Sequence, residues 1–293
     1  IVLFCTNKWG WGFENFMAEA NLGTGAKVKK WMYYYCKFVL PVIILALFLM
    51  FINTSLEAAQ KFVKKDIKAV STDRFNIEAT LTYPQNKTQK EFATVILLHS
   101  LGYNSEWWGD LPQELLNKGY AVLAIDLRGH GSSIYNSRLA KTSWKNLKNS
   151  AFTKYPDDVL TIINKVKEEN TKRIFFDNYA IVGADIGAST GVITADKMQI
   201  KPKTIIMLSP VVESKGLYIP VSMAHLNKVD FLSITGTDDT MSKEADNYLK
   251  QFVQDEYATY TSESKTTGMM MLKNDQHLPK IITEWISEYL NLE

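Results

Sequence analysis

From residue 73 to the end of the chain, short apolar runs alternate with amphipathic stretches. This alternation is typical of an α/β fold, in which helical crossovers connect the strands of one sheet. Most of the runs are apolar without interruption, as expected for strands that are covered on both faces of a parallel sheet. Residues 73–293 are therefore predicted to form a mostly parallel, doubly wound sheet flanked by helices.

The same pattern predicts the individual elements. Residues 77–83 alternate between apolar and polar positions, which indicates an early antiparallel strand. Continuous apolar runs predict strands at 93–99, 121–126, 180–182, 204–208, 230–235 and 267–272. Helical spacing predicts helices at 111–118, 156–169, the segment after Gly187, and 281–290.

One segment near the N-terminus is apolar enough to enter a membrane. Residues 38–52 carry no charge, and with the aromatic residues 31–35 the stretch reaches about 22 residues, the length of a transmembrane helix. Lysines at 27, 29, 30 and 37 precede it, so residues 1–37 are expected on the cytoplasmic side. Residues 53–72 are polar and lysine-rich and are expected to be a linker.

Two interpretations of residues 38–52 stay open. The segment is either a transmembrane helix or the core of a signal peptide that starts at Met32 and is cleaved near Ala58 and Ala59. A buried helix of a soluble protein is disfavoured because residues 38–52 contain no polar side chain. Both favoured interpretations deliver residues 73–293 to the outside of the cytoplasm, anchored or secreted.

Composition excludes several classes of function. Thirty-three basic and thirty-one acidic residues leave a net charge of +2, too small for a dedicated nucleic-acid binder. Cys5 and Cys36 are the only cysteines, so the predicted α/β domain holds no disulfide and no Cys-ligated metal. No metal-ligand spacing and no phosphate loop appears, and we expect neither a metal nor a cofactor.

Residues capable of chemistry follow the predicted strands. In an open parallel sheet, ligands bind beyond the carboxyl ends of the strands. His277 comes after the last predicted strand. The motifs after the other strands are His99-Ser100-Leu101-Gly102, Asp126-Leu127-Arg128-Gly129-His130-Gly131, Gly183-Ala184-Asp185-Ile186-Gly187 and Gly236-Thr237-Asp238-Asp239.

Taken in chain order, these four motifs and His277 resemble the motifs of the α/β-hydrolase superfamily over residues 92–290. The resemblance is greatest to small bacterial hydrolases with a D-x-R-G-H-G motif. The resemblance implies the α/β-hydrolase fold, with a nucleophile elbow at residues 183–187. It also implies a catalytic triad and an oxyanion hole. The triad would be Asp185 as nucleophile, Asp239 as orienting acid and His277 as base, and the oxyanion donors would be the N–H groups of Ile186 and of Leu101 or Ser100. Only residues 210–229 separate two successive strands where relatives carry a helical cap, so no large cap domain is expected.

Position 185 departs from the G-x-S-x-G pattern of most of the superfamily. Its carboxylate is ionised without help from a base, and it lies at a helix N-terminus, which favours an anion. Carboxylates displace better at saturated carbon than at acyl carbon, as in the haloalkane dehalogenases and epoxide hydrolases of the superfamily, where a histidine-activated water then hydrolyses the ester. We expect a hydrolase of a small ester-like, epoxide or haloalkane-type substrate. The alternative is an inactive module that has lost the serine nucleophile and binds a ligand or partner through the same cleft.

Other interpretations of these residues also stay open. Asp185 is alternatively a solvated turn residue, and His277 a surface histidine, since Leu278 stands where the superfamily usually has glycine. His99 and His130 are expected to be structural. Trp107 and Trp108 are candidates for lining a substrate pocket, with packing in the core as the alternative.

Residues 9–52 carry a second resemblance. Trp9-Gly10-Trp11-Gly12, Asn21-Leu22-Gly23-Thr24-Gly25 and Trp31-Met32-Tyr33-Tyr34-Tyr35 are similar to the end of bacterial sodium-coupled neurotransmitter symporters, at the cytoplasmic loop and eleventh helix. The stretch lacks the substrate and sodium sites of that family, so it implies a fused or read-through fragment, and membership of a transporter is the weakest hypothesis. The topology of the family agrees with the lysine asymmetry. Together the two resemblances imply a bacterial, extracytoplasmic protein that contacts the membrane through residues 38–52 if they are not cleaved.

Overall fold

The computed structural model describes residue 10 and residues 12–24, 27–48, 62–85, 91–169 and 174–290. It divides into two compact units, Ile1–Gln60 and Lys61–Glu293. Cys5 and the expected cleavage point at Ala58 and Ala59 lie outside the described residues.

The N-terminal unit is helical. Helix α2 covers Phe13–Ala20, and α3 (Trp31–Tyr34) continues through the π-helical turn η1 (Tyr35–Val39) into helical residues 40–48. Together Trp31–Phe48 form 18 helical residues with a mean hydropathy of 1.7 and no buried positions. This length and composition fit a membrane-spanning helix, and a signal sequence shares them. The helix begins earlier than the apolar run that predicted it, and positions 49–52 of that run are not described.

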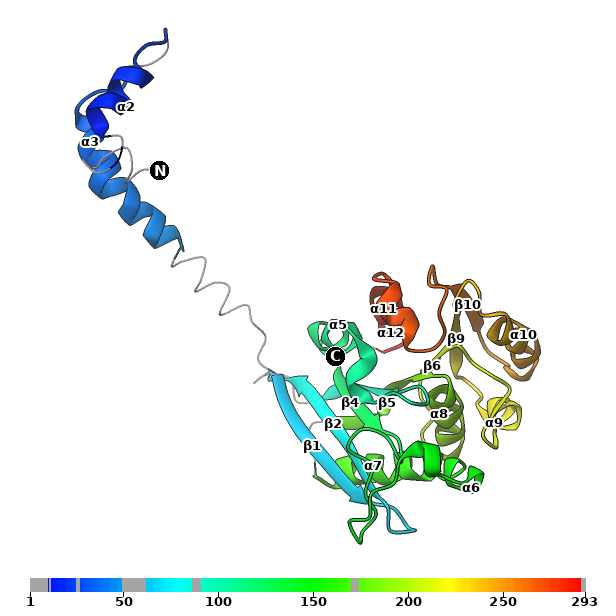
Figure 1. Ribbon diagram of the computed structural model, residues 1–293. Helices are drawn as coiled ribbons and strands as arrows, with labels where there is room; N and C mark the ends of the chain where they lie inside the picture. Colours follow the sequence, from blue (N-terminus) through cyan, green and yellow to red (C-terminus); the bar gives the residue numbers. More distant parts are fainter. Residues whose placement is uncertain are drawn as a thin grey trace. The chain divides into compact units, whose positions relative to one another are not determined.

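The second unit is built on one eight-stranded sheet (Figure 1). The two strands at one edge are antiparallel to their neighbours, and the remaining pairs, from β4 to β10, are all parallel. This arrangement confirms the predicted, mostly parallel sheet. In spatial order the strands are β1 (Phe62–Val70), β2 (Asn76–Pro84), β4 (Ala121–Asp126), β3 (Phe92–Leu98), β5 (Ile174–Ala184), β6 (Thr204–Leu208), β9 (Asp230–Thr235) and β10 (Tyr257–Thr261).

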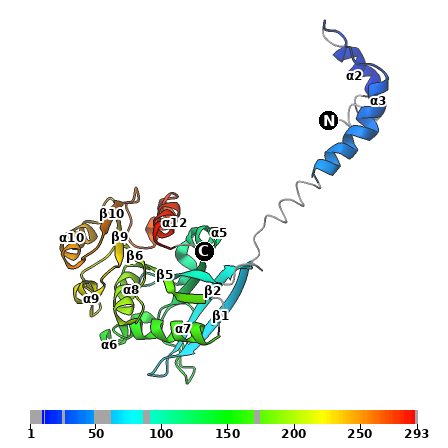
Figure 2. The same ribbon diagram turned by 180° about the vertical axis from the view of Figure 1, so that it is seen from behind.

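Helices cover both faces of this sheet (Figure 2). One face packs on α7 (Tyr155–Glu169), α8 (Ile186–Lys197) and α10 (Thr240–Leu249), and the other on α5 (Leu111–Asn117) and α12 (Leu278–Tyr289). Strands β3, β4 and β6 are buried along their whole length, as their unbroken apolar runs predict. The shorter helical segments are η2 (Ser105–Trp108), η3 (Trp144–Asn146), α6 (Asn149–Phe152), η4 (Lys250–Phe252) and α11 (Met270–Asn274).

The segment between β6 and β9 is short, as expected. It holds a small hairpin, β7 (Glu213–Ser214) and β8 (Leu217–Tyr218), and one two-turn helix, α9 (Pro220–His225). A fold with this sheet order and helical covering, and without a large cap, is the predicted α/β-hydrolase fold.

Two sequence-based expectations differ from the structure. Residues 62–70, expected within a linker, form β1 and pair with β2 over nine positions. The lysines that suggested a linker lie on exposed positions of this edge strand. Residues 267–272, expected as the last strand, form a loop and the start of α11, while the last strand is β10. The apolar run at 267–272 reflects burial in a loop and a short helix, whereas β10 lies at the sheet edge, is only partly buried, and has a weaker apolar pattern.

Candidate functional site

The sharp turn between β5 and α8 presents Asp185 at the carboxyl edge of the sheet. Asp185 immediately precedes α8 with φ 52° and ψ −118°, a conformation that is strained for a residue with a side chain and that occurs mainly at functional sites. A Cβ on Gly183 would lie 2.5 Å from the Cα of Ala188, and one on Gly187 would overlap the carbonyl oxygen of Leu98. The flanking glycines are therefore a steric requirement of the turn.

Backbone donors hold the carboxylate of Asp185. The N–H of Leu101 donates to Oδ2 at 3.3 Å, and the N–H of Ile186 also bonds to this carboxylate. The N–H of Ser100 instead points to the sulfur of Met269 at 3.3 Å. Of the three donors expected for an oxyanion hole, Leu101 and Ile186 reach Asp185, and Ser100 is engaged elsewhere.

The surroundings of Asp185 both raise and lower its pKa, and the net effect is to raise it. Burial raises the pKa of Asp185, and the negative charge of Asp239 raises it further. The N–H groups of Leu101 and Ile186 and the ammonium of Lys215 act in the opposite direction without reversing the shift. The net effect is that the pKa of Asp185 lies above the value of a free aspartate.

Two buried histidines hold the loop that carries Leu101. Nε2 of His99 accepts the N–H of Leu127 at 2.9 Å, and Nε2 of His130 accepts the N–H of Gly102 at 2.9 Å. Each Nδ1 lies beside a backbone carbonyl oxygen, at 2.8 and 3.2 Å, so both rings are assigned as neutral with the proton on Nδ1. Burial lowers the pKa of His99 to about 4 and also lowers that of His130. As expected from the sequence, both histidines are structural, and their rings meet edge to face at 4.9 Å.

Asp239 lies in the turn between β9 and α10, immediately before the helix. Its Oδ1 accepts the N–H of Ser242 at 3.2 Å and so caps this helix. The residue is only 5% exposed. Its second oxygen, Oδ2, is buried and has no hydrogen-bond partner among the described residues.

The loop after the last strand, residues 262–269, crosses the ends of several strands, and we call it the cover loop. The N–H of Gly268 donates to Oγ of Ser209 at 2.8 Å, and the N–H of Met269 donates to Oγ of Ser100 at 3.2 Å. A Cβ built on Gly268 would lie 3.8 Å from the Cβ of Asp185. The loop that follows the last strand therefore brings a glycine, with no side chain, against Asp185.

His277 lies beyond this loop. It precedes α12, its side chain is exposed, and its N–H donates to Oδ1 of Asp275 at 3.0 Å. Within the described part of the chain, its ring makes no hydrogen bond or ion pair with Asp185 or Asp239. His277 lies in the connection after the last strand, as expected, but that strand is β10, which ends at Thr261, and the short helix α11 lies between them. The triad of Asp185, Asp239 and His277 stays a prediction.

The two candidate tryptophans have different environments. Trp108 is fully buried in the core under α5, so it packs in the core and does not line a substrate pocket. Trp107 is 49% exposed. It borders a surface hollow of about 780 Å³ that is also lined by Glu106, Asp110, Lys273, Gln276 and Pro279.

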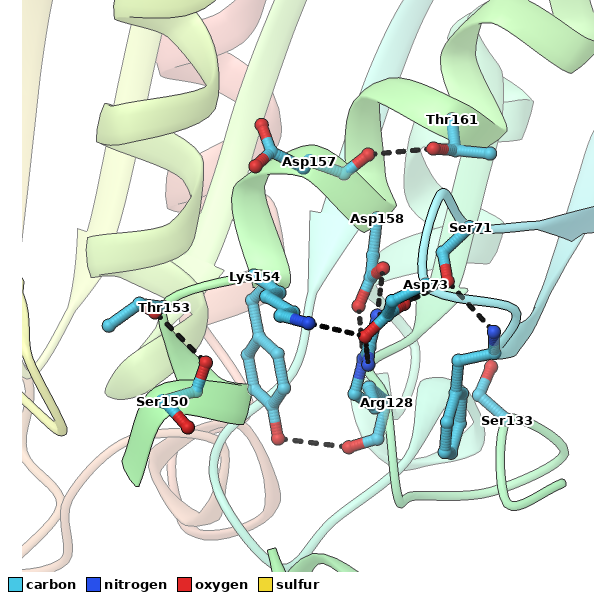
Figure 3. A network of polar contacts seen from close by, with 12 residues as sticks. Ser71, Asp73, Arg128, Ser133, Ser150, Thr153, Lys154, Asp157, Asp158 and Thr161 are labelled. Atoms are coloured by element: carbon cyan, nitrogen blue, oxygen red, sulfur yellow. Dashed lines mark hydrogen bonds and ion pairs between the residues drawn. The ribbon is translucent and has the colours of Figure 1, made fainter. Parts of the chain in front are cut away.

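A buried ion-pair network anchors the loop after β4 (Figure 3). The guanidinium of Arg128 binds Asp158 on α7 through two hydrogen bonds of 2.8 and 2.7 Å, and Asp73 in the β1–β2 turn at 2.6 Å. Lys154 also pairs with Asp73 at 2.7 Å. Hydrogen bonds from Arg128 hold the pKa of Asp73 far below its usual value, while burial raises that of Asp158 to about 6. The sequence motif that contains Arg128 gives no indication of its acidic partners, which are distant in the sequence.

A bound metal finds no support in the described parts of the chain. No group of three or more His, Cys, Asp or Glu side chains there is arranged to hold a metal ion.

Comparisons with known proteins agree with this architecture. Residues 89–268 match the family model for serine aminopeptidase, S33. The fold is similar to an esterase from Exiguobacterium antarcticum, with 12% identity and a TM-score of 0.54, over 75% of this chain and 98% of that chain. It is also similar to a highly thermostable carboxyl esterase from Bacillus coagulans, with 12% identity and a TM-score of 0.60, over 78% and 99%.

A third similar structure is a dienelactone hydrolase from Anabaena variabilis, with 12% identity and a TM-score of 0.58, over 78% of this chain and 99% of that chain. Identities this low establish a shared fold and no shared substrate. No protein of curated function matches the sequence. The similarity of residues 9–52 to symporters stays a prediction, because the family match begins at residue 89.

Proposed function

We propose that the chain, which belongs to the serine aminopeptidase S33 family of α/β-hydrolases, binds a small molecule at the elbow of the hydrolase scaffold without turning it over. One observation carries this proposal: within the described residues no histidine ring bonds to Asp185 or Asp239, and the cover loop places Gly268, which has no side chain, against Asp185. The proposal corresponds to the inactive-module alternative of the sequence analysis.

The positions of the histidines support it. The sequence holds four, and all of them are described. The rings of His99 and His130 each accept a hydrogen bond from a backbone N–H, and the exposed His225 pairs with Asp196 at 3.2 Å. The fourth, His277, is exposed at the start of α12.

Without a base at the elbow, covalent catalysis by Asp185 would stop at the covalent intermediate. Attack of a carboxylate on saturated carbon expels the leaving group and leaves an alkyl ester on Asp185, which water hydrolyses only with the help of a base. Attack on an ester would give an anhydride and expel a poor alkoxide leaving group. A site of this kind binds ligands more readily than it turns them over.

A second candidate is an Asp-nucleophile hydrolase that uses Asp185, Asp239 and His277. It is favoured by the hydrogen bonds from Leu101 and Ile186 to the carboxylate of Asp185. Such donors would stabilise one carboxyl oxygen while the other forms the covalent bond and again during hydrolysis of the ester. This candidate requires His277 to move to the elbow.

The test is a turnover assay on the full chain. Wild type, Asp185→Asn, His277→Ala and the control His225→Ala are compared on one panel of activated short-chain esters, epoxides and haloalkanes. We expect no multiple turnover by any of them. Turnover by wild type and by His225→Ala that is lost in both other variants would replace the binding proposal with the second candidate. Turnover that survives Asp185→Asn would contradict both.

A further inference from the structure

The hollow beside Trp107 is a second concave feature of the hydrolase-like domain. Its volume is about 780 Å³, and neither Asp185 nor Asp239 is among the residues that line it. Small-molecule sites usually have volumes of roughly 300–1,000 Å³, so the hollow has the size of such a site. One wall comes from η2 and the segment that leads into α5, and the other from α11 and the start of α12. Helices α5 and α12 lie side by side (Figure 1).

The indole of Trp107 forms an apolar platform in this hollow. Trp107 and Trp108 are adjacent in the 3₁₀ turn η2, and while Trp108 enters the core, Trp107 stays about half exposed. The ring of Tyr103 packs edge to face against the ring of Trp107, with centroids 5.2 Å apart. Leu272 and Pro279, both buried, add apolar surface beside the indole. Because a neighbouring ring already holds the indole, a ligand that packs on it has little side-chain motion to restrict.

Polar side chains of both charges surround this platform. Glu106 and Asp110 belong to one wall, and Lys273 and Gln276 belong to the other. All four side chains are exposed, and among the described residues their polar ends form no hydrogen bond or ion pair. Two carboxylates, one ammonium and one carboxamide are therefore available to a ligand that lies on the indole.

From this combination we infer that the hollow binds a saccharide, with one face of a sugar ring stacked on Trp107. A hydroxyl group both donates and accepts hydrogen bonds, so a sugar satisfies the carboxylates of one wall as well as the ammonium and the amide of the other. An organic cation would match the indole and the carboxylates, but it would meet the positive charge of Lys273. The inference goes beyond the proposed function, because the elbow does not line this hollow.

The first measurement is the binding of neutral trisaccharides to the full chain. Maltotriose, cellotriose and triacetylchitotriose are titrated by calorimetry, with sorbitol and choline as controls. Sorbitol has hydroxyl groups but no ring to stack on the indole, and choline has a cation but only one hydroxyl group. We expect at least one trisaccharide to bind about tenfold more tightly than either control. Failure of all three trisaccharides to bind, or binding of sorbitol or choline that is as tight as theirs, would overturn the inference.

Variants at the platform locate the binding. Trp107→Ala removes the indole and should weaken trisaccharide binding about tenfold, whereas Trp107→Phe keeps an aromatic face and should retain most of it. Tyr135→Ala, at an exposed aromatic residue that does not line the hollow, is the control and should leave binding unchanged. Undiminished binding by folded Trp107→Ala would overturn the inference.

A pair of variants at Glu106 separates a sugar from a cation and does not depend on the Trp107 variants. Glu106→Gln removes the charge but keeps an oxygen that accepts from hydroxyl groups, so it should weaken trisaccharide binding less than Glu106→Ala does. An equal loss in the two variants, or no loss in either, would overturn the inference. The turnover assay is independent of these outcomes, because none of the variants changes a residue of the elbow.

Discussion

His99 and His130 tie the stability of the domain to pH through the direction of their hydrogen bonds. Each Nε2 accepts a backbone N–H, so a proton on that nitrogen would set two donors against each other. The pKa of His99 is about 4 in the folded protein and about 6.5 in an unfolded chain. Between these values the unfolded state binds more protons, so the free energy of unfolding rises with pH there and falls on acidification.

We therefore predict that the shift of His99 alone lowers stability by on the order of 3 kcal/mol as pH falls from about 6.5 to about 4, while the raised pKa of Asp158 acts in the opposite direction over the same window. Urea unfolding at a series of pH values measures it, with the slope of stability against pH as the readout. His99→Asn should lower the slope of stability against pH in this window relative to wild type, and the control His225→Asn, at an exposed histidine, should leave the wild-type slope unchanged. An unchanged slope in His99→Asn would contradict the role assigned to the ring.

Single residues were predictable from the sequence where a local motif fixes them. The glycine spacing places Asp185 at the elbow because the turn tolerates no side chain at either flank. The state of Asp239 Oδ2 was not predictable, because it depends on which side chain the cover loop brings near. His277 illustrates the same limit, since its assigned role depended on which segment forms the last strand.

At the scale of elements, Arg128 joins three parts of the domain that are far apart in the sequence. Its guanidinium lies 4% exposed between the β1–β2 turn, the loop after β4 and helix α7. If the arginine were removed, the buried carboxylate of Asp158 would lose its cation. The polar links left at this point would be the Lys154–Asp73 pair and the hydrogen bond from Tyr155 Oη to the backbone carbonyl of residue 128.

Arg128→Ala should lower the free energy of unfolding by about 3–5 kcal/mol, as for other buried ion pairs that lose one partner. Lys154→Met is the matched control in the same network. It breaks an exposed pair with Asp73 and should cost less than about 1 kcal/mol. Chemical denaturation of the full chain at neutral pH measures both. Similar losses in the two variants would show that burial of Arg128 is not what gives the network its stabilising effect.

Elements were predictable from the sequence where burial is uniform along them. Strands β4, β6 and β9 have the predicted bounds because each is buried along nearly its whole length and is therefore mostly apolar. Strands β1 and β10 lie at the sheet edges and carry polar residues on their exposed positions. Their patterns do not distinguish them from a linker or a loop, and only the pairing with β2 and β9 defines them.

At the scale of the whole molecule, the helix Trp31–Phe48 has the length and composition of a membrane span, and a signal sequence shares them. If this helix anchors the chain, the full-length protein should stay with membranes after washing with high salt and alkaline carbonate. Ile44→Arg combined with Leu47→Arg should release it, because each arginine costs about 2.5–3.5 kcal/mol at the centre of a membrane helix. Arginines at the exposed Leu139 and Ile200 of the domain are the control and should not release it.

Cell fractionation tests whether the chain is bound to the membrane, and the mass of the purified chain tests whether it is processed. A mature chain that begins beyond residue 52 would identify the helix as a signal sequence instead. Unprocessed full-length protein in the soluble fraction would contradict both forms of the membrane hypothesis.

Strand β1 has a consequence for how copies of this protein behave when crowded. It pairs with β2 along its full length, and among the described residues no strand covers its other side, so its outer backbone groups offer a template for another chain. Lys64, Lys65 and Lys68 lie on exposed positions of this strand. A second copy that docked there edge to edge would bring its own lysines against them, and the resulting repulsion is a safeguard against aggregation that the chain carries in its sequence.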